Sequence, residues 1–168
     1  PKANVAVISE TRARALADTL ATSAFKVRSV DEKPYRSSPK APFMTSTLQQ
    51  EGGRKLRLGA AQVMRVAQGL YERGYITYMR TDNVVLSEEA LAAARAEVKG
   101  LYGENFLSPS PRQFTTKVKN AQEAHEAIRP TTPLRSPDGV AAELNPQELN
   151  LYRLIWQRTL ASQMADAT

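Results

Sequence analysis

The segment from Gly74 to Asn83 (GYITYMRTDN) contains the residues best suited to chemistry. Tyr78 and Arg80 are two positions apart, so in an extended backbone they would share a face. A phenol that attacks a phosphodiester needs a nearby cation to stabilise the phenolate and the charge that develops on phosphorus. Arginine suits that task because its planar guanidinium stays charged and can contact two phosphate oxygens. Taken alone, such a pair is far more often a core tyrosine beside a surface arginine.

A second cluster, QEAHEAIRP, runs from Gln122 to Pro130. A short helix over 122–128 would bring His125 and Arg129 to one face, because they are four residues apart. Together they could bind one phosphate, or His125 could transfer a proton near neutral pH. A zinc site made of imidazoles is excluded, because the chain has one histidine. An isolated histidine is also commonly structural, so both interpretations stay open from the spacing alone.

Basic residues surround these two segments. The net charge is +4 over 1–50, +3 over 51–84 and +3 over 111–135, whereas 85–110 and 136–168 each carry −2. Such a surplus favours an anionic partner, most often nucleic acid, although many basic domains bind none. The residues that could contact phosphates without reading sequence are Arg54, Lys55, Arg57, Lys117 and Lys119.

The composition excludes several other classes of protein. The chain has 168 residues, of which 42% are hydrophobic and 24% charged, as is typical of a folded domain. It has no cysteine, which excludes a disulfide framework, a thiolate zinc site and a cysteine nucleophile. We find no apolar run long enough to span a bilayer and no signal-peptide pattern.

Helices are the elements expected to position the chemical residues. Caps and apolar periodicity predict them over about 10–22, from Thr45 or Ser46 to Gly52-Gly53, over 60–73 and over 88–99. The clearest is the last helix, which Asn145 caps, with Pro146 at its first position and Glu148 completing a capping box. Its expected apolar face comprises Leu149, Tyr152, Ile155, Trp156, Leu160 and Met164. The expected fold class is therefore mainly α with a small β part.

The β part and the domain boundary lie near the N-terminus. Residues 25–30 (FKVRSV) alternate between apolar and polar, which predicts a half-buried strand. The proline- and serine-rich stretch 34–42 predicts a linker. We therefore expect a first segment over 1–38 and a helical domain over 39–168.

Three motifs, in this order, resemble the type IA DNA topoisomerases of bacteria, specifically topoisomerase I. They are APFMTSTLQQ from Ala41 to Gln50, GYITYMRTD from Gly74 to Asp82, and QEAHEAIRPT from Gln122 to Thr131. The resemblance covers about 41–166 and extends to the closing helix. Met79 after the tyrosine favours topoisomerase I over topoisomerase III, which usually has proline there. Asn83 departs from the serine of many members, which puts any hydroxyl role at position 83 in doubt.

The resemblance implies roles for individual residues. Tyr78 would attack a phosphodiester of single-stranded DNA and stay joined to the 5′ phosphate, while Arg80 would position that phosphate and His125 would bind phosphate or assist proton transfer. The same resemblance adds Arg129 and Thr81 to the candidate DNA contacts, beside Arg54, Arg57, Lys117 and Lys119. Negative supercoils would be relaxed without ATP, because the phosphotyrosine keeps the bond energy.

The resemblance also implies what this chain lacks. The family binds magnesium at an acidic cluster of a Toprim domain, and the 168 residues contain no DxD pair. We therefore expect a tyrosine domain with a helical DNA-binding-like fold, with part of the adjoining arch at 1–38 and no metal site of its own. The expected partners are single-stranded DNA and the Toprim and other domains of the same enzyme, without a membrane. The expected location is the bacterial cytoplasm, at the nucleoid.

Two other functions remain open at this stage. A DNA-binding module without a catalytic residue would bind in a salt-sensitive way and would not need the Tyr78 hydroxyl. A tyrosine recombinase or type IB enzyme would form a 3′ linkage with a different set of Arg and His residues. The end of the DNA that becomes attached to protein separates these alternatives.

Overall fold

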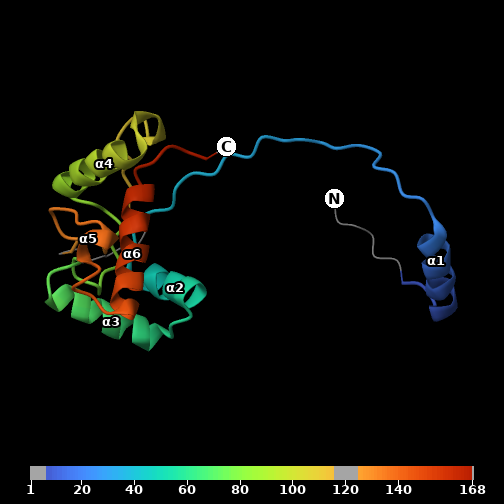
Figure 1. The fold of residues 1–168 in the computed structure, drawn as a ribbon, viewed down its shortest axis with the longest axis horizontal. Helices are drawn as coiled ribbons and strands as arrows, with labels where there is room; N and C mark the ends of the chain where they lie inside the picture. Colours follow the sequence, from blue (N-terminus) through green and yellow to red (C-terminus); the bar gives the residue numbers. More distant parts are fainter. Residues whose placement is uncertain (1–6, 116–124, 168) are drawn as a thin grey trace. The chain divides into compact units, whose positions relative to one another are not determined.

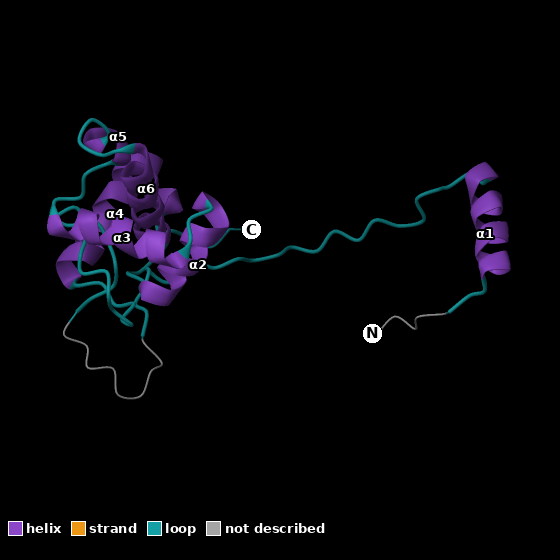
Figure 2. Ribbon diagram, turned by 90° about the horizontal axis from the view of Figure 1, so that it is seen from below, coloured by secondary structure: helices purple, strands orange, loops and turns teal. Residues whose placement is uncertain are grey.

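The computed structural model describes residues 7–115 and 125–167 of the chain. Two compact units divide this part, one ending at Pro34 and the other starting at Tyr35 (Figure 1). Helices form almost all of the regular structure (Figure 2), which confirms the mainly α prediction. Among the described residues, β structure is limited to isolated bridges.

The second unit starts slightly before the expected boundary at 38/39. The N-terminal residues of this unit pair with its C-terminal residues. Ser37 N donates to Ala167 O at 2.9 Å, and Ala167 N donates to Ser37 O at 3.0 Å. Asp166 also forms an ion pair with Arg36 at 2.8 Å and another with Arg112. Residues 35–38 therefore belong to the helical unit.

The first unit contains helix α1 (Glu10–Thr22), which confirms the helix expected over about 10–22. Ser9 caps it, because Ser9 Oγ accepts from Arg12 N at 3.4 Å. The strand expected over 25–30 is wrong. Its apolar residues Phe25, Val27 and Val30 are at least three-quarters exposed, and no described segment pairs with them. An alternating apolar and polar pattern forms a strand only where a neighbouring strand pairs with its backbone, and no described segment does so for residues 25–30.

The second unit is built around its last helix. Its elements are α2 (Thr45–Leu56), α3 (Ala60–Glu72), α4 (Glu88–Tyr102), the 3₁₀ helix η1 (Glu104–Phe106), α5 (Pro137–Val140) and α6 (Pro146–Ala161). Helix α6 packs against α2, α3, α4 and α5. No helix in this described part of the chain combines the length and apolar composition needed to cross a membrane.

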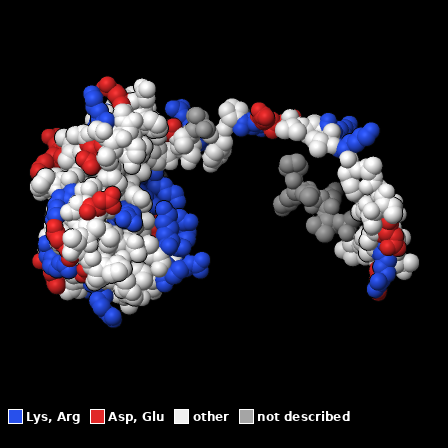
Figure 3. Space-filling view, viewed as in Figure 1, with Lys and Arg blue, Asp and Glu red and all other residues white. Residues whose placement is uncertain are grey.

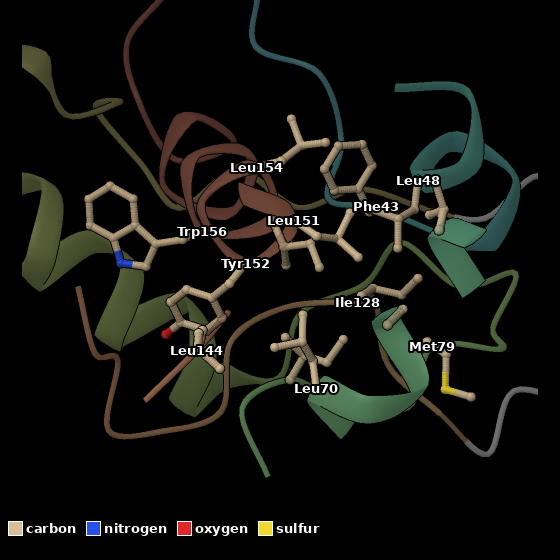
Figure 4. Packing of buried hydrophobic residues seen from close by; sticks show 14 of the residues in the cluster. Phe43, Leu48, Leu70, Met79, Ile128, Leu144, Leu151, Tyr152, Leu154 and Trp156 are labelled. Carbon is tan, nitrogen blue, oxygen red and sulfur yellow. The ribbon is translucent and has the colours of Figure 1, made fainter. Parts of the chain in front are cut away.

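The capping box of α6 is confirmed. Asn145 Oδ1 accepts from Glu148 N and Glu148 Oε2 accepts from Asn145 N, both at 3.0 Å. The single apolar face expected for α6 is too narrow, because Leu151 and Leu154 are buried as well (Figure 4). A helix enclosed by other helices needs apolar residues around most of its circumference.

Helix α2 does not end at Gly52-Gly53 as expected, because these glycines lie inside it and Arg57 closes it at φ +59°. The reason for glycine is packing against α3. A Cβ on Gly52 would lie 2.6 Å from Val63 Cγ2, whereas a Cβ on Gly53 would meet nothing closer than Leu58 O at 3.5 Å. Gly52 therefore permits the close approach of the two helices.

These two glycines make a matched pair for a stability measurement. We expect Gly52→Ala to leave the chain about 1–3 kcal/mol less stable than Gly53→Ala, because only Gly52→Ala overpacks the core. Both substitutions gain the same helix propensity of about 1 kcal/mol, which cancels in the comparison. Urea unfolding of the 168-residue chain measures the difference. Equal stabilities of the two variants would show that Gly52 is not needed for the contact.

Candidate active site

The tyrosine segment begins where α3 ends. Gly74 turns the chain with φ +76°, a conformation that favours glycine. The chain then pairs with the second motif, because Thr77 N donates to Arg129 O at 2.9 Å and Thr131 N donates to Tyr75 O at 3.1 Å. The two motifs that sequence analysis singled out are therefore joined directly by main-chain hydrogen bonds.

This pairing also corrects the expected helix over 122–128. Residues 122–124 lie outside the described residues, and the described residues 125–128 are not helical. Their main chain bonds to distant segments instead: Ile128 N donates to Phe43 O at 2.8 Å, and Ala127 O accepts from Thr77 Oγ1 at 2.7 Å. The argument that His125 and Arg129 share one helix face is therefore wrong.

The start of the segment is tied to the loop before α6. Tyr75 donates from its hydroxyl to Glu143 Oε2 at 2.5 Å, and the Arg73 guanidinium lies 5.0 Å from the Tyr75 ring centre. Hydrogen bonds from Arg135 and then from Tyr75 lower the pKa of Glu143 to about 2. This carboxylate is therefore ionised at neutral pH and fixes the turn that leads to Tyr78.

The end of the segment is held by the start of α2. Thr45 N donates to Thr81 O and Thr81 N donates to Thr45 Oγ1, both at 2.9 Å. The Thr45 hydroxyl donates in turn to Met79 O at 2.8 Å. The first and second motifs thus meet through this threonine, which explains why a threonine-rich helix start precedes the tyrosine segment.

The Tyr78 ring is half-buried between two other aromatic rings. The His125 ring centre lies 4.6 Å from that of Tyr78 with an interplanar angle of 44°, and the Tyr71 ring lies edge-on at 5.2 Å and 69°. Both distances are in the range in which aromatic pairs attract. The structure therefore brings the predicted Tyr78 and His125 together. Sequence analysis missed Tyr71, although its place in the last turn of α3, just before Gly74, puts it near the segment.

Arg80 lies in a bent part of the chain rather than in the expected extended one. The backbone bends at Met79 and Arg80, so Met79 is buried at 4% exposure while Arg80 is exposed. Within the described part of the chain, Arg80 forms no ion pair. Its charge is therefore available to an anion.

Arg129 is placed differently, with 6% exposure. Its guanidinium donates to both carboxylate oxygens of Glu126, at 2.7 and 2.9 Å, and to Pro130 O at 2.8 Å. Burial raises the pKa of Glu126, but the hydrogen bonds from Arg129 and Ser87 outweigh it, so the pKa is lowered overall. In this conformation the buried charge of Arg129 is therefore compensated by the carboxylate of Glu126.

Thr81 is also buried and hydrogen-bonded to another residue of the chain. It is 8% exposed, and its Oγ1 accepts from Asn83 N at 3.0 Å. The Asn83 side chain continues this network: its Oδ1 accepts from Val85 N at 2.9 Å, and its Nδ2 donates to His125 O at 3.1 Å. The amide of Asn83 thus bridges the tyrosine segment and the histidine.

Basic side chains gather over and beside α2 on the face shown in Figure 3. We define the α2 basic patch as Arg54, Lys55, Arg57 and Arg158. Three of these surround one carboxylate, because Glu51 Oε2 lies 2.9 Å from Arg54, 3.9 Å from Lys55 and 3.8 Å from Arg158. The remaining member, Arg57, is exposed and has no ion pair with another described residue. The candidates Lys117 and Lys119 lie outside the described residues.

The described residues do not fit a magnesium site. Among them, no three of the His, Cys, Asp or Glu side chains cluster to hold a metal ion. Asp82 lies within the tyrosine segment, but it is not part of any group of three or more such side chains among the described residues. At this site the described residues supply a phenol, an imidazole and guanidinium groups, and no cluster of three or more potential metal ligands.

Known proteins resemble nearly the whole chain. The family model for DNA topoisomerase matches residues 2–168. DNA topoisomerase 1 of Mycolicibacterium smegmatis is 57% identical over 164 residues, covering 97% of this chain and 18% of that protein. DNA topoisomerase 1 of Streptomyces coelicolor is 58% identical over 167 residues, covering 99% and 17%. Full-length topoisomerase I of Thermotoga maritima matches in structure with a TM-score of 0.66 and 38% identity, covering 79% of this chain and 22% of that one. The chain thus spans less than a fifth of the length of these curated relatives.

Proposed function

This chain belongs to the DNA topoisomerase family, and on that premise we propose that it supplies the nucleophile of a bacterial topoisomerase I. The observation that carries the proposal is the position of Tyr78, half-buried against Tyr71 and His125. Two residues later comes Arg80, which is exposed and forms no ion pair with another described residue. Attack of a phenol on a phosphodiester requires a cation near the phosphate, and Arg80 provides an exposed guanidinium in the same segment.

The proposed reaction exchanges one phosphodiester for another. The Tyr78 phenolic oxygen bonds to phosphorus, the bond from phosphorus to the 3′ oxygen breaks, and the phenolic proton passes to solvent or a neighbouring group while the 3′ oxygen gains one. Arg80 stabilises the charge on phosphorus, and His125 binds phosphate or carries the proton. The reverse attack by the 3′ hydroxyl reseals the strand. Negative supercoils are thereby relaxed without ATP, because no bond energy is lost.

The proposed DNA contacts fall into two groups. Arg80 and three members of the α2 basic patch, Arg54, Lys55 and Arg57, are exposed, so they can neutralise phosphates of single-stranded DNA without reading its sequence. The fourth member, Arg158, is only 13% exposed and supports the patch from within. Arg129 and Thr81 support the site from within in this conformation, so they would reach DNA only if the segment rearranged. Lys117 and Lys119 remain proposed contacts outside the described residues.

The remaining parts of the reaction are assigned to the rest of the enzyme. Magnesium would be held by carboxylates of the Toprim domain, since the described residues do not fit it. The first unit, which ends at Pro34, would belong to the adjoining arch, which supports the DNA gate. The proposed location is the bacterial cytoplasm, at the nucleoid.

A chimera tests the proposal. Residues 2–167 would replace the matching region of the Mycolicibacterium smegmatis protein, and the product would be incubated with magnesium and single-stranded DNA. We expect a covalent adduct in which a 3′-end label stays with protein and a 5′-end label is released, because Tyr78 would hold the 5′ phosphate. We also expect relaxation of negatively supercoiled plasmid, and none from the isolated 168-residue chain.

Other outcomes would contradict the proposal in distinct ways. Retention of the 5′-end label would indicate a 3′ linkage and the chemistry of the recombinases and type IB enzymes. Salt-sensitive binding without any adduct would favour a DNA-binding module without a catalytic residue. Relaxation by the isolated chain would show that it needs no other domain.

A further inference from the structure

The side chain of Asn83 lies where the tyrosine segment meets the histidine. Asn83 is 8% exposed, and both ends of its amide are used: Oδ1 accepts from Val85 N at 2.9 Å and Nδ2 donates to His125 O at 3.1 Å. Only an amide of this length offers an acceptor and a donor in opposite directions. A serine could not make both bonds from one position, and an aspartate would lack the donor.

The bond to His125 matters because the histidine side chain itself is exposed. An exposed side chain keeps one position only where its main chain is fixed, because rotamer freedom opposes order. Hydrogen bonds from the segment after Asn83 fix the residues that follow the histidine: Ala127 N donates to Val85 O at 2.9 Å, and Glu126 Oε2 accepts from Ser87 N at 3.2 Å. The Asn83 amide extends this support to His125.

We propose that Asn83 is a positioning residue that acts through His125, holding its main chain so that the imidazole lies against the Tyr78 ring. The inference rests on the proposed function, because it assigns His125 to the reacting site. It also explains why asparagine is suitable at position 83, where many family members have serine. What position 83 must supply is a hydrogen-bond donor toward the His125 carbonyl, and the side-chain NH2 of asparagine supplies it.

The single histidine of the chain allows a direct test on the 168-residue chain itself. His125 gives the only imidazole proton signals in the NMR spectrum, and stacking on Tyr78 should shift them upfield through the ring current. Tyr78→Leu defines the unshifted position, because it removes the ring. The spectra of the parent chain and of every variant are recorded at the same pH and ionic strength, so that their imidazole signals can be compared directly.

The decisive variant is Asn83→Asp, which keeps the size of the side chain and the acceptor for Val85 N. It replaces the donor with an oxygen that faces the carbonyl of His125, so the two would repel each other. We expect most of the upfield shift to disappear. The matched control Asn105→Asp adds the same charge at an exposed position of η1 and should leave the shift unchanged. An unchanged His125 shift in Asn83→Asp would overturn the proposal.

A measurement on the unmodified chain does not depend on how the variants fold. The Asn83 side-chain NH2 protons should show nuclear Overhauser contacts with the main chain of His125 and Glu126, because Nδ2 lies 3.1 Å from His125 O. Contacts of these protons with solvent alone would contradict the inference.

The chimera adds a catalytic readout. Asn83→Asp and the uncharged Asn83→Leu should each slow adduct formation about tenfold, the scale of losing one buried hydrogen bond. In a His125→Ala background neither should slow it further, because a positioning residue has no effect once its target is absent. Losses of equal size with and without His125 would overturn the proposal. If no chimera forms an adduct, the proposed function fails, whereas the NMR result still decides the role of Asn83.

Discussion

Changing Tyr78 to Phe in the chimeric topoisomerase should abolish the covalent DNA adduct and lower the relaxation rate by at least about 10⁴-fold, as is typical when a nucleophile is removed. The change removes one hydroxyl and keeps the ring. The contacts of that ring with Tyr71 and His125, at centre distances of 5.2 and 4.6 Å, are therefore preserved. DNA binding and helical content should stay at the level of the parent protein, because neither depends on this oxygen.

The neighbouring Tyr71 supplies a matched control. It is 41% exposed and lies beside Tyr78, so it is the other phenol that could attack a phosphate at this site. Tyr71→Phe should retain the adduct at nearly the parent level, because its proposed part is ring packing alone. An adduct that survives in Tyr78→Phe and is lost in Tyr71→Phe would reverse the assignment. Mass spectrometry of the DNA-linked peptide identifies the attached residue directly.

The helices were predictable because their signals are local. The Asn145 cap, the proline after it and Glu148 lie within four residues and fix the start of α6 regardless of the surroundings. Ser87 likewise caps α4, accepting from Ala90 N at 3.3 Å. Two elements that rest on more distant partners were wrong. No described segment pairs with residues 25–30, and residues 125–128 bond to remote segments rather than to their own turn.

The chemical residues were only partly predictable. Tyr78, Arg80 and His125 carry a family motif, so they could be named from the sequence. The contacts of these candidates could not, because the ring contact of Tyr71 with Tyr78 and the hydrogen bond from Asn83 to His125 O form only in the folded chain. Arg129 was misplaced for a different reason: it was expected on a helix face with His125, whereas residues 125–128 are not helical and Arg129 pairs with Glu126, three residues before it. The local backbone conformation, rather than the spacing, decides which partner such a cation takes.

This difference between paired and free cations determines what Arg80 should do. Arg129 has a carboxylate at 2.7 Å, whereas Arg80 is exposed and has no ion pair in the described part of the chain. A guanidinium without a partner keeps its full attraction for a phosphate. It loses little on binding because no ion pair has to be broken.

Arg80→Ala in the chimera should therefore lower the rate of adduct formation at saturating DNA about 10²–10³-fold, the usual cost of removing one group that stabilises a developing charge. Arg80→Lys should recover part of that loss, because lysine restores the positive charge but cannot form the bidentate contact of a guanidinium with two phosphate oxygens. The exposed Arg57 provides the control. Arg57→Ala should weaken DNA binding and lower the slope of log affinity against log salt concentration by about one, which corresponds to one lost phosphate contact. The rate of adduct formation at saturating DNA should not change. Single-turnover cleavage across DNA concentrations separates rate from affinity. If Arg80→Ala changed only the affinity, as Arg57→Ala is expected to do, Arg80 would be one more backbone contact rather than part of the reacting site.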